Sequence, residues 1–278
     1  MEKSKKDLTN YVLVNGYKIG YRKQGNGTPI VLANRFRGTL DTWDPLFINL
    51  LSQTNTVITF DYVGIGYSEG VLSEDLSIIV HQIKALTDAL QLNQFHLLGW
   101  SYGGWVAQYF MHMYNENVLK TVIIGSNPVG KNEIPIQAEF FERALKPYND
   151  FDDELVLFYK PTSKQSKKAA LISYQRIQEQ LDVSKIPNTQ EQFQRYFAAA
   201  PAVTEDVKNY RSKLITTKTP ILVISGDNDI SYATENWFPL LNKAKTIQHI
   251  ILPDSGHAVH FQYPVLSTNY IKVFLMNN

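Results

Sequence analysis

The stretch Gly-Trp-Ser-Tyr-Gly-Gly at residues 99–104 decides the fold of this 278-residue chain. The apolar run 95–98 before it has strand character, and residues 105–111 after it have a helical pattern. A serine between a strand and a helix, with Gly99 and Gly103 two positions away on either side, is typical of a very tight turn. Such a turn strains the serine backbone and makes its hydroxyl project from the sheet. The glycines let the two backbones pass without a β-carbon clash. The pattern therefore predicts that Ser101 is a nucleophile.

Strand and helix patterns alternate on both sides of this turn. Patterns of strand character occupy residues 29–33, 56–61, 95–98, 119–125, 220–225 and 247–252. The first two are continuous apolar runs, as expected for strands buried on both faces. Helical patterns occupy residues 41–51, 76–90, 105–111, 233–243 and 264–276. A hairpin with its turn at Asn15 and Gly16 precedes them. The helix over 76–90 is expected to turn one apolar side inward, formed by Ile78, Ile79, Ile83, Leu86 and Leu90. The alternation predicts an α/β fold with a mostly parallel, doubly wound sheet and helices on both faces.

Residues 127–214 interrupt this alternation. Helical patterns rich in aromatic residues, among them Phe140 and Phe197, replace the strands there. The interruption predicts a helical cap, or lid, at 127–214, inserted into a core that residues 1–126 and 215–278 form together.

Composition limits the classes of function. A formal net charge of +1 gives no basic face for nucleic acid, so we expect no nucleic-acid partner. The absence of cysteine excludes disulfides, thiolate catalysis and cysteine-ligated metals. The glycine-rich loop 64–70 has the spacing G-x-G-x-x-x-G, which is not that of a dinucleotide site. We therefore expect neither a cofactor nor a metal.

Hydropathy bears on localisation. No run approaches the roughly 20 apolar residues of a membrane span. Residues 1–10 carry Lys3, Lys5 and Lys6, and no apolar stretch of signal-peptide length follows them. The sequence thus predicts a cytoplasmic protein without a membrane span, as a monomer or homodimer.

A serine hydroxyl needs a base to become nucleophilic, and the chain offers six histidines. His96 and His249 lie in predicted strands, His112 in a helix and His81 on the polar face of a helix, where packing or solvation explains them. His257 follows Gly256 in a loop just past the strand 247–252, and reactive groups gather at the carboxyl ends of such strands. His260 competes with it. We favour His257, because the turn at Gly256 would direct it over the edge of the sheet.

An acidic group must orient that histidine. Asp227 and Asp229 follow the strand 220–225, and Asp254 lies three residues before His257. Asp254 fits a turn in its own loop, and Asp227 beside Gly226 also fits a turn. Asp229 lies deeper in its loop and can reach the loop after the next strand, so it is the preferred acid.

These motifs together resemble the capped, single-domain α/β-hydrolases over nearly the whole chain. The matching features are the elbow at 99–104, the D-x-x-G-x-G-x-S loop at 61–68, the G-x-x-D loop at 226–229 and Gly256-His257. The order Ser101, Asp229, His257 is that of the family, and the cap enters between nucleophile and acid. The resemblance implies a triad of these residues and, more specifically, an esterase or a cofactor-free haloperoxidase-like enzyme.

The resemblance also implies an oxyanion hole of two backbone N–H groups. One belongs to Tyr102. The other comes from the loop after strand 29–33, usually His-Gly-x-x-Gly, which here reads Asn-Arg-Phe-Arg-Gly at 34–38. Aligning Gly38 with the last glycine makes Phe36 the donor, with a register open by one residue. Arg35 and Arg37 could meet an anionic substrate, but a structural pairing with Asp41 or Asp61 is the preferred interpretation.

The leading hypothesis is a serine hydrolase that cleaves a small, largely apolar carboxylic ester through an acyl-enzyme on Ser101. The same triad could serve thioesters, lactones, C–C bonds or acyl transfer, including transfer to peroxide. A peptidase specific for N-terminal residues is disfavoured, because the Gly-Gly-Ser-Trp-Gly elbow of that branch is absent. A low-turnover ligand-binding receptor is the alternative from another class.

Overall fold

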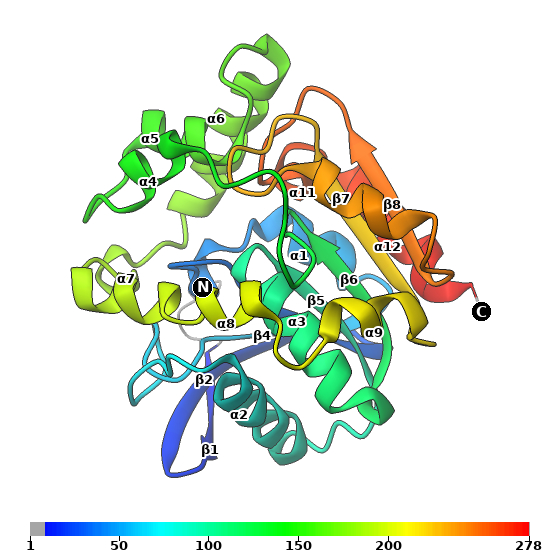
Figure 1. Cartoon of the computed structure of the whole chain (residues 1–278). Helices are drawn as coiled ribbons and strands as arrows, with labels where there is room; N and C mark the ends of the chain where they lie inside the picture. The colour runs from blue at the N-terminus through cyan, green and yellow to red at the C-terminus, as the bar shows by residue number, and fades with distance from the viewer. Residues whose placement is uncertain (1–8, 278) are drawn as a thin grey trace.

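A computed structural model describes residues 9–277; Met1, the lysines at 3, 5 and 6 and Asn278 lie outside the described residues. The described chain forms one eight-stranded sheet in the order β1-β2-β4-β3-β5-β6-β7-β8 (Figure 1). The strands are β1 Asn10–Val14, β2 Tyr17–Gln24, β3 Thr28–Ala33, β4 Asn55–Phe60, β5 Phe95–Trp100, β6 Val118–Ile124, β7 Ile221–Gly226 and β8 Ile247–Leu252. Within residues 9–277, none of the helices has the length and apolar character that a membrane crossing requires.

The sheet is antiparallel at one end and parallel elsewhere. β1 and β2 form the predicted hairpin, in which Asn15 and Gly16 have φ angles of 50° and 88°. Positive φ at both central residues is what a type I′ turn requires. β2 pairs antiparallel with β4, and each later neighbour pair is parallel. The predicted fold class is therefore confirmed.

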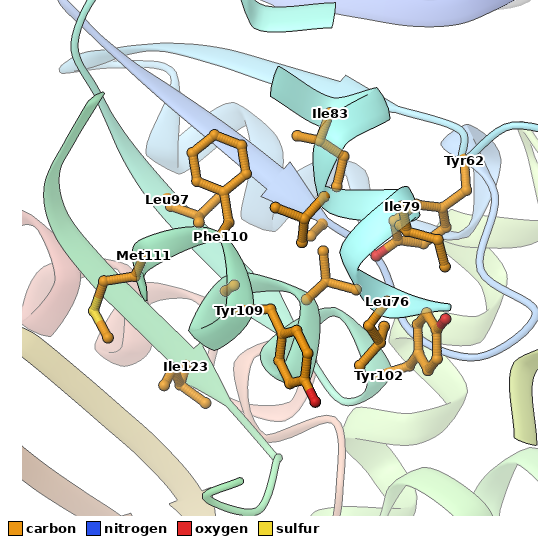
Figure 2. Packing of buried hydrophobic residues seen from close by; sticks show 14 of the residues in the cluster. Tyr62, Leu76, Ile79, Ile83, Leu97, Tyr102, Tyr109, Phe110, Met111 and Ile123 are labelled. Carbon is orange, nitrogen blue, oxygen red and sulfur yellow. The ribbon is translucent and has the colours of Figure 1, made fainter. Parts of the chain in front are cut away.

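β4, β5 and β7 are buried over their whole length, so both of their faces are covered, whereas Gln248 and Ile251 of the edge strand β8 are exposed. Neighbouring residues of a strand point to opposite sides of the sheet. In β3, Val31 faces the core beneath α2 (Leu76–Ala89) and α3 (Tyr102–Met113), whereas Leu32 faces the core beneath α1 (Pro45–Leu51) and α12 (Pro264–Met276). Figure 2 shows the first core, where Ile79 and Ile83 from α2 pack toward Phe110 of α3. Ile78 was expected on this apolar side but is 47% exposed. That expectation is wrong. Neighbouring residues of a helix point in different directions, so Ile78 faces solvent when Ile79 packs on the core.

Some helices are shorter than their sequence patterns. The pattern at 41–51 divides into a 3-10 turn, η2 (Leu40–Thr42), and α1, because Asp44 caps α1 by accepting the Leu46 N–H at 2.8 Å and Pro45 begins it. The pattern at 233–243 becomes η5 (Thr234–Trp237) and α10 (Phe238–Leu241). One short helix, α11 (Val259–Gln262), was not expected.

A run of helices lies between β6 and β7, where the cap is predicted. It comprises α4 Ala138–Ala144, α5 Phe151–Phe158, α6 Lys164–Gln178, η4 Val183–Lys185, α7 Gln190–Phe197, α8 Ala200–Glu205 and α9 Tyr210–Thr216. Figure 1 shows α4, α5 and α6 grouped at the upper left, away from α9. α9 packs on α3, with the rings of Tyr109 and Tyr210 4.8 Å apart. The boundary expected at residue 214 thus falls inside α9. We call residues 127–214 the cap segment.

Asp44 joins the core to the cap segment. Its side chain is buried and accepts hydrogen bonds from Ser173 Oγ at 2.6 Å and Arg176 Nε at 2.9 Å, both on α6. The same carboxylate caps α1. One buried charge therefore serves a helix end, a hydroxyl and a guanidinium at once.

Asp44→Ala should lower the free energy of unfolding by about 2–4 kcal/mol, because it removes a helix cap and leaves a half-buried guanidinium without its carboxylate. Chemical denaturation measures this change. The matched control is Asp88→Ala, which removes the exposed pair of Lys84 and Asp88 within α2 and should cost less than about 0.5 kcal/mol. Equal costs for the two variants would contradict the interpretation.

Candidate active site

Ser101 occupies the strained turn between β5 and α3 that the sequence predicts. Its φ of 60° and ψ of −119° lie outside the regions that L-residues favour. The flanking glycines are required by close backbone contact: a β-carbon at Gly103 would lie 2.1 Å from the Ala33 carbonyl oxygen, and one at Gly99 would lie 2.1 Å from the Gly103 oxygen. The predicted backbone strain and close approach are therefore confirmed. The turn places the hydroxyl at the carboxyl edge of the sheet.

His257 and Asp229 meet at the same edge, from the loops that follow β8 and β7. His257 Nδ1 lies 2.7 Å from Asp229 Oδ2, and both side chains are buried. Asp229 Oδ1 accepts the N–H groups of Ser231 at 2.8 Å and Tyr232 at 3.0 Å. These bonds fix the Asp229 carboxylate. Because Asp229 contacts His257 at Nδ1, the other imidazole nitrogen, Nε2, is not held by Asp229.

The competing acids lie elsewhere. Asp227 accepts the Ser255 N–H at 3.1 Å, and Asp254 pairs with Lys160 Nζ at 2.9 Å. Their side chains are 38% and 50% exposed. Of the carboxylates in residues 9–277, that of Asp229 lies within hydrogen-bond distance of His257.

The competing histidine, His260, is a packed residue. It lies in α11 among Trp43, Phe47 and Trp100, with ring centroids 6.1, 4.9 and 4.6 Å away. Burial holds its pKa well below the ordinary value, and neither ring nitrogen has a hydrogen-bond partner among the described residues. A neutral imidazole without polar contacts is a core side chain here.

Ser101 and His257 line one small cavity between the core and the cap segment. Its volume is about 20 Å³, room for one water molecule. The other lining residues are Arg35, Phe36, Arg37, Phe140, Ala144, Asn149, Leu157 and Phe158. Among the described residues there is no hydrogen bond between the Ser101 hydroxyl and His257, a bond that often tightens only when a ligand is present. Because the cavity is so small, side chains fill most of the site.

A larger cavity, of about 570 Å³, lies at the opposite edge of the sheet. Its lining includes Val118 and Leu119 at the start of β6 and Pro220 just before β7. Ligands of parallel α/β sheets bind beyond the carboxyl ends of the strands, which is where Ser101 lies. Volume alone would thus select a site at the edge of the sheet opposite Ser101.

The loop after β3 forms a second wall of the catalytic cavity. Residues 35–38 make a tight turn, closed by the Gly38 N–H bonding to the Arg35 carbonyl at 3.0 Å. Asn34 holds both ends of the loop: its Nδ2 donates to Thr39 O at 2.9 Å, and its Oδ1 accepts the Arg35 N–H at 2.8 Å. This organising role was not predicted, because only the departure of Asn34 from the usual histidine was visible in the sequence.

Two backbone N–H groups near Ser101 have no partner in the described structure. Tyr102 is the first residue of α3, whose leading N–H groups have no intrahelical acceptor. The Phe36 N–H lies in the 35–38 turn and is engaged in none of the hydrogen bonds of residues 9–277. Both groups are free to bind a ligand oxygen.

Arg37 has a partner of an unexpected kind. The pairing of Arg35 or Arg37 with Asp41 or Asp61 is wrong: Asp41 binds Arg22 Nη2 at 2.6 Å, and Asp61 accepts the Leu40 and Tyr67 N–H groups at 2.8 Å. Arg37 is buried and donates to the cap segment instead. Its acceptors are the carbonyls of Ala144, Lys146, Pro147 and Pro187 and the Asn149 side-chain oxygen, all at 2.7–2.9 Å. Burial and the neighbouring Arg35 lower the pKa of Arg37 to about 10.

Known proteins share this architecture. The sequence is 26% identical over 246 residues to the dihydrolipoyllysine-residue acetyltransferase component of the acetoin cleaving system of Pseudomonas putida, which covers 85% of this chain and 60% of that protein. It is 32% identical over 120 residues to a proline iminopeptidase of Lactiplantibacillus plantarum, covering 40% of this chain and 42% of that one. The chain thus spans less than two thirds of the length of either curated relative.

One solved structure matches almost end to end. An alpha/beta hydrolase fold protein from Chitinophaga pinensis superposes with a TM-score of 0.85 at 26% identity, over 97% of this chain and 98% of its own. The sequence pattern of the alpha/beta hydrolase fold family matches residues 28–264, a range that contains Ser101, Asp229 and His257. The chain therefore belongs to the alpha/beta hydrolase fold family.

Proposed function

We propose that the protein is a serine hydrolase of a small, largely apolar carboxylic ester, acting through an acyl-enzyme on Ser101. The 2.7 Å contact between His257 Nδ1 and Asp229 Oδ2, beside a serine held at positive φ, carries the proposal. Membership of a hydrolase family supports the reaction class. The ester and the roles of the three residues are our assignment.

In the first step Ser101 Oγ attacks the ester carbonyl carbon while His257 Nε2 takes the hydroxyl proton. Asp229 keeps the proton of the imidazole on Nδ1 and stabilises the cation that forms. The imidazolium then protonates the departing alkoxide, and the alcohol leaves. A water molecule, deprotonated by the same histidine, attacks the acyl-enzyme, and collapse of the second tetrahedral intermediate releases the acid and restores Ser101.

The negative charge on the carbonyl oxygen needs donors placed in advance. We assign this role to the N–H groups of Tyr102 and Phe36. Their lack of other partners supports the assignment, since a donor already bonded within the protein would have to give up that bond. Removing one such donor in comparable enzymes costs about 100- to 1,000-fold in turnover.

We further propose that the cap segment, residues 127–214, acts as the lid of this site. Five of its residues line the cavity beside Ser101: the apolar Phe140, Ala144, Leu157 and Phe158, and the polar Asn149. A cavity of about 20 Å³ is far below the volume of a typical ligand pocket, so binding requires side chains of the lid to move. The apolar character of four of these residues favours an apolar acyl or alcohol group.

Ser101→Ala should abolish labelling by a fluorophosphonate probe and lower the hydrolysis of a short p-nitrophenyl ester by about 1,000-fold or more, because no nucleophile remains. Labelling is followed by mass spectrometry and hydrolysis by release of p-nitrophenolate. Equal rates for wild type and variant would show that Ser101 is not the nucleophile. A wild-type protein that takes up no label would overturn the enzyme proposal.

Asp229→Asn should lower turnover by about 1,000- to 10,000-fold with little change in structure. The amide keeps an oxygen for the N–H groups of Ser231 and Tyr232, but its NH₂ faces His257 Nδ1 and forces the proton onto Nε2, where it blocks the base. The matched control is Asp227→Asn, which keeps an acceptor for Ser255 and should retain most activity. The reverse result would reassign the acid.

Phe140→Ala should shift the preference toward longer acyl chains, because it removes a ring from the wall of the catalytic cavity. An acyl-chain-length panel of p-nitrophenyl esters measures the shift. Phe197→Ala is the matched control: its ring packs on Phe36, with centroids 5.0 Å apart, and does not line the cavity. An identical length profile in wild type and Phe140→Ala would contradict the assigned pocket.

A further inference from the structure

Arg35 is a partly buried cation with few partners. Its Nη1 donates to the Phe36 carbonyl at 2.7 Å, and its guanidinium carbon lies 4.6 Å from the ring centroid of Phe158 and 5.3 Å from that of Trp100. Its Nε is buried and has no hydrogen-bond partner in the described structure. No carboxylate of residues 9–277 lies within 4.0 Å of it. The guanidinium therefore keeps unused donors.

Unused guanidinium nitrogens are not a general property of this loop, because Arg37, two residues further along, has none among the described residues. Arg37 uses each of its side-chain nitrogens on oxygens of the cap segment. Its structural role accounts for its burial. The Arg35 side chain makes one hydrogen bond in the described structure, to the carbonyl of its neighbour Phe36, and none to the cap segment. Its hydrogen bonds within the protein therefore do not explain why the Arg35 guanidinium lies in this partly buried position.

The missing partner is an anion. A guanidinium that has lost part of its hydration and has no ion-pair partner favours an anionic ligand, because contact with two aromatic faces only partly replaces that hydration. Glu154, the nearby acid, forms no ion pair with Arg35 in the described structure, and burial raises its pKa. Burial lowers the pKa of Arg35, and the charge of Glu154, which is not within ion-pair distance, offsets part of that shift.

The location of Arg35 indicates which anion it meets. Arg35 lines the catalytic cavity together with Ser101 and His257. It also lines a neighbouring cavity of about 30 Å³, with Glu154 and Trp100. Arg35 thus borders both small cavities, and its planar fork of donors matches a carboxylate.

We propose that Arg35 binds a free carboxylate of the substrate, so that the enzyme acts on small esters that carry one carboxylate near the scissile carbonyl. This rests on the proposed esterase function and names its substrate class. The carboxylate could belong to the acyl part, as in a half-ester of a dicarboxylic acid, or to the alcohol part, as in an ester of a hydroxy acid. Both present the same group to Arg35.

The test uses matched esters with and without the charge. Ethyl hydrogen glutarate is compared with ethyl pentanoate for the acyl side, and acetoxyacetate with ethyl acetate for the alcohol side. Product formation is followed by proton NMR. For at least one pair, wild-type kcat/KM should be about tenfold or more higher for the charged ester. Arg35→Gln should lower that charged-to-neutral ratio by about 10- to 100-fold, mainly through KM, and Arg35→Lys should restore part of it.

Arg37→Gln is the control. It removes the bonds between the loop and the cap segment, so it should lower the rates of both esters of a pair together and leave their ratio unchanged. A ratio that Arg35→Gln does not change, or a wild type that prefers the neutral ester in both pairs, would overturn the proposal.

Binding separates this proposal from the esterase proposal. In the Ser101→Ala background, calorimetry should detect ethyl hydrogen glutarate or acetoxyacetate, and adding Arg35→Gln should weaken that binding by about tenfold or more. If wild type binds the anion through Arg35 but hydrolyses neither ester pair, the esterase proposal fails and the carboxylate site stands. If neither anion binds, the carboxylate site fails whatever the hydrolysis result.

Discussion

The close passage of three backbones at the nucleophile turn is the constraint on which the site depends. β5 enters the turn, α3 leaves it, and the carboxyl end of β3 runs beside both, so that a β-carbon at Gly99 or Gly103 would overlap a carbonyl. This crowding fixes Ser101 at positive φ and puts the start of α3 next to the loop after β3. The two free N–H groups at Tyr102 and Phe36 owe their proximity to the same crowding.

The charged side chains near this edge of the sheet differ in whether the protein itself supplies their hydrogen-bond partners. Asp229 receives two backbone N–H groups as well as His257, and Asp44 receives a guanidinium and a hydroxyl. Arg37 is surrounded by carbonyl oxygens. Arg35, which lines the cavity with Ser101, is a partly buried cation without an ion pair in the described structure. The structural charges are thus satisfied internally, and the remaining one faces the cavity.

The sequence could predict features that residue type and spacing encode. Strands with apolar residues on both faces, such as 29–33, and the turn at Ser101 were found because each is a local pattern. Helix limits were less accurate, since the start of α1 depends on the cap at Asp44 and on Pro45 rather than on apolar periodicity. The partners of Arg37 were missed for a different reason. All but the Asn149 side-chain oxygen are backbone carbonyls, which every residue possesses, so the residue types at 144–147 and 187 could not indicate them.

The hydrogen bonds of Arg37 have a consequence for movement. They tie the loop that carries Phe36 to two separate stretches of the cap segment, 144–149 and Pro187. Outward displacement of either stretch must break these bonds or pull the loop with it. A movement of the cap segment that widens the cavity beside Ser101 therefore also disturbs the loop that carries Phe36.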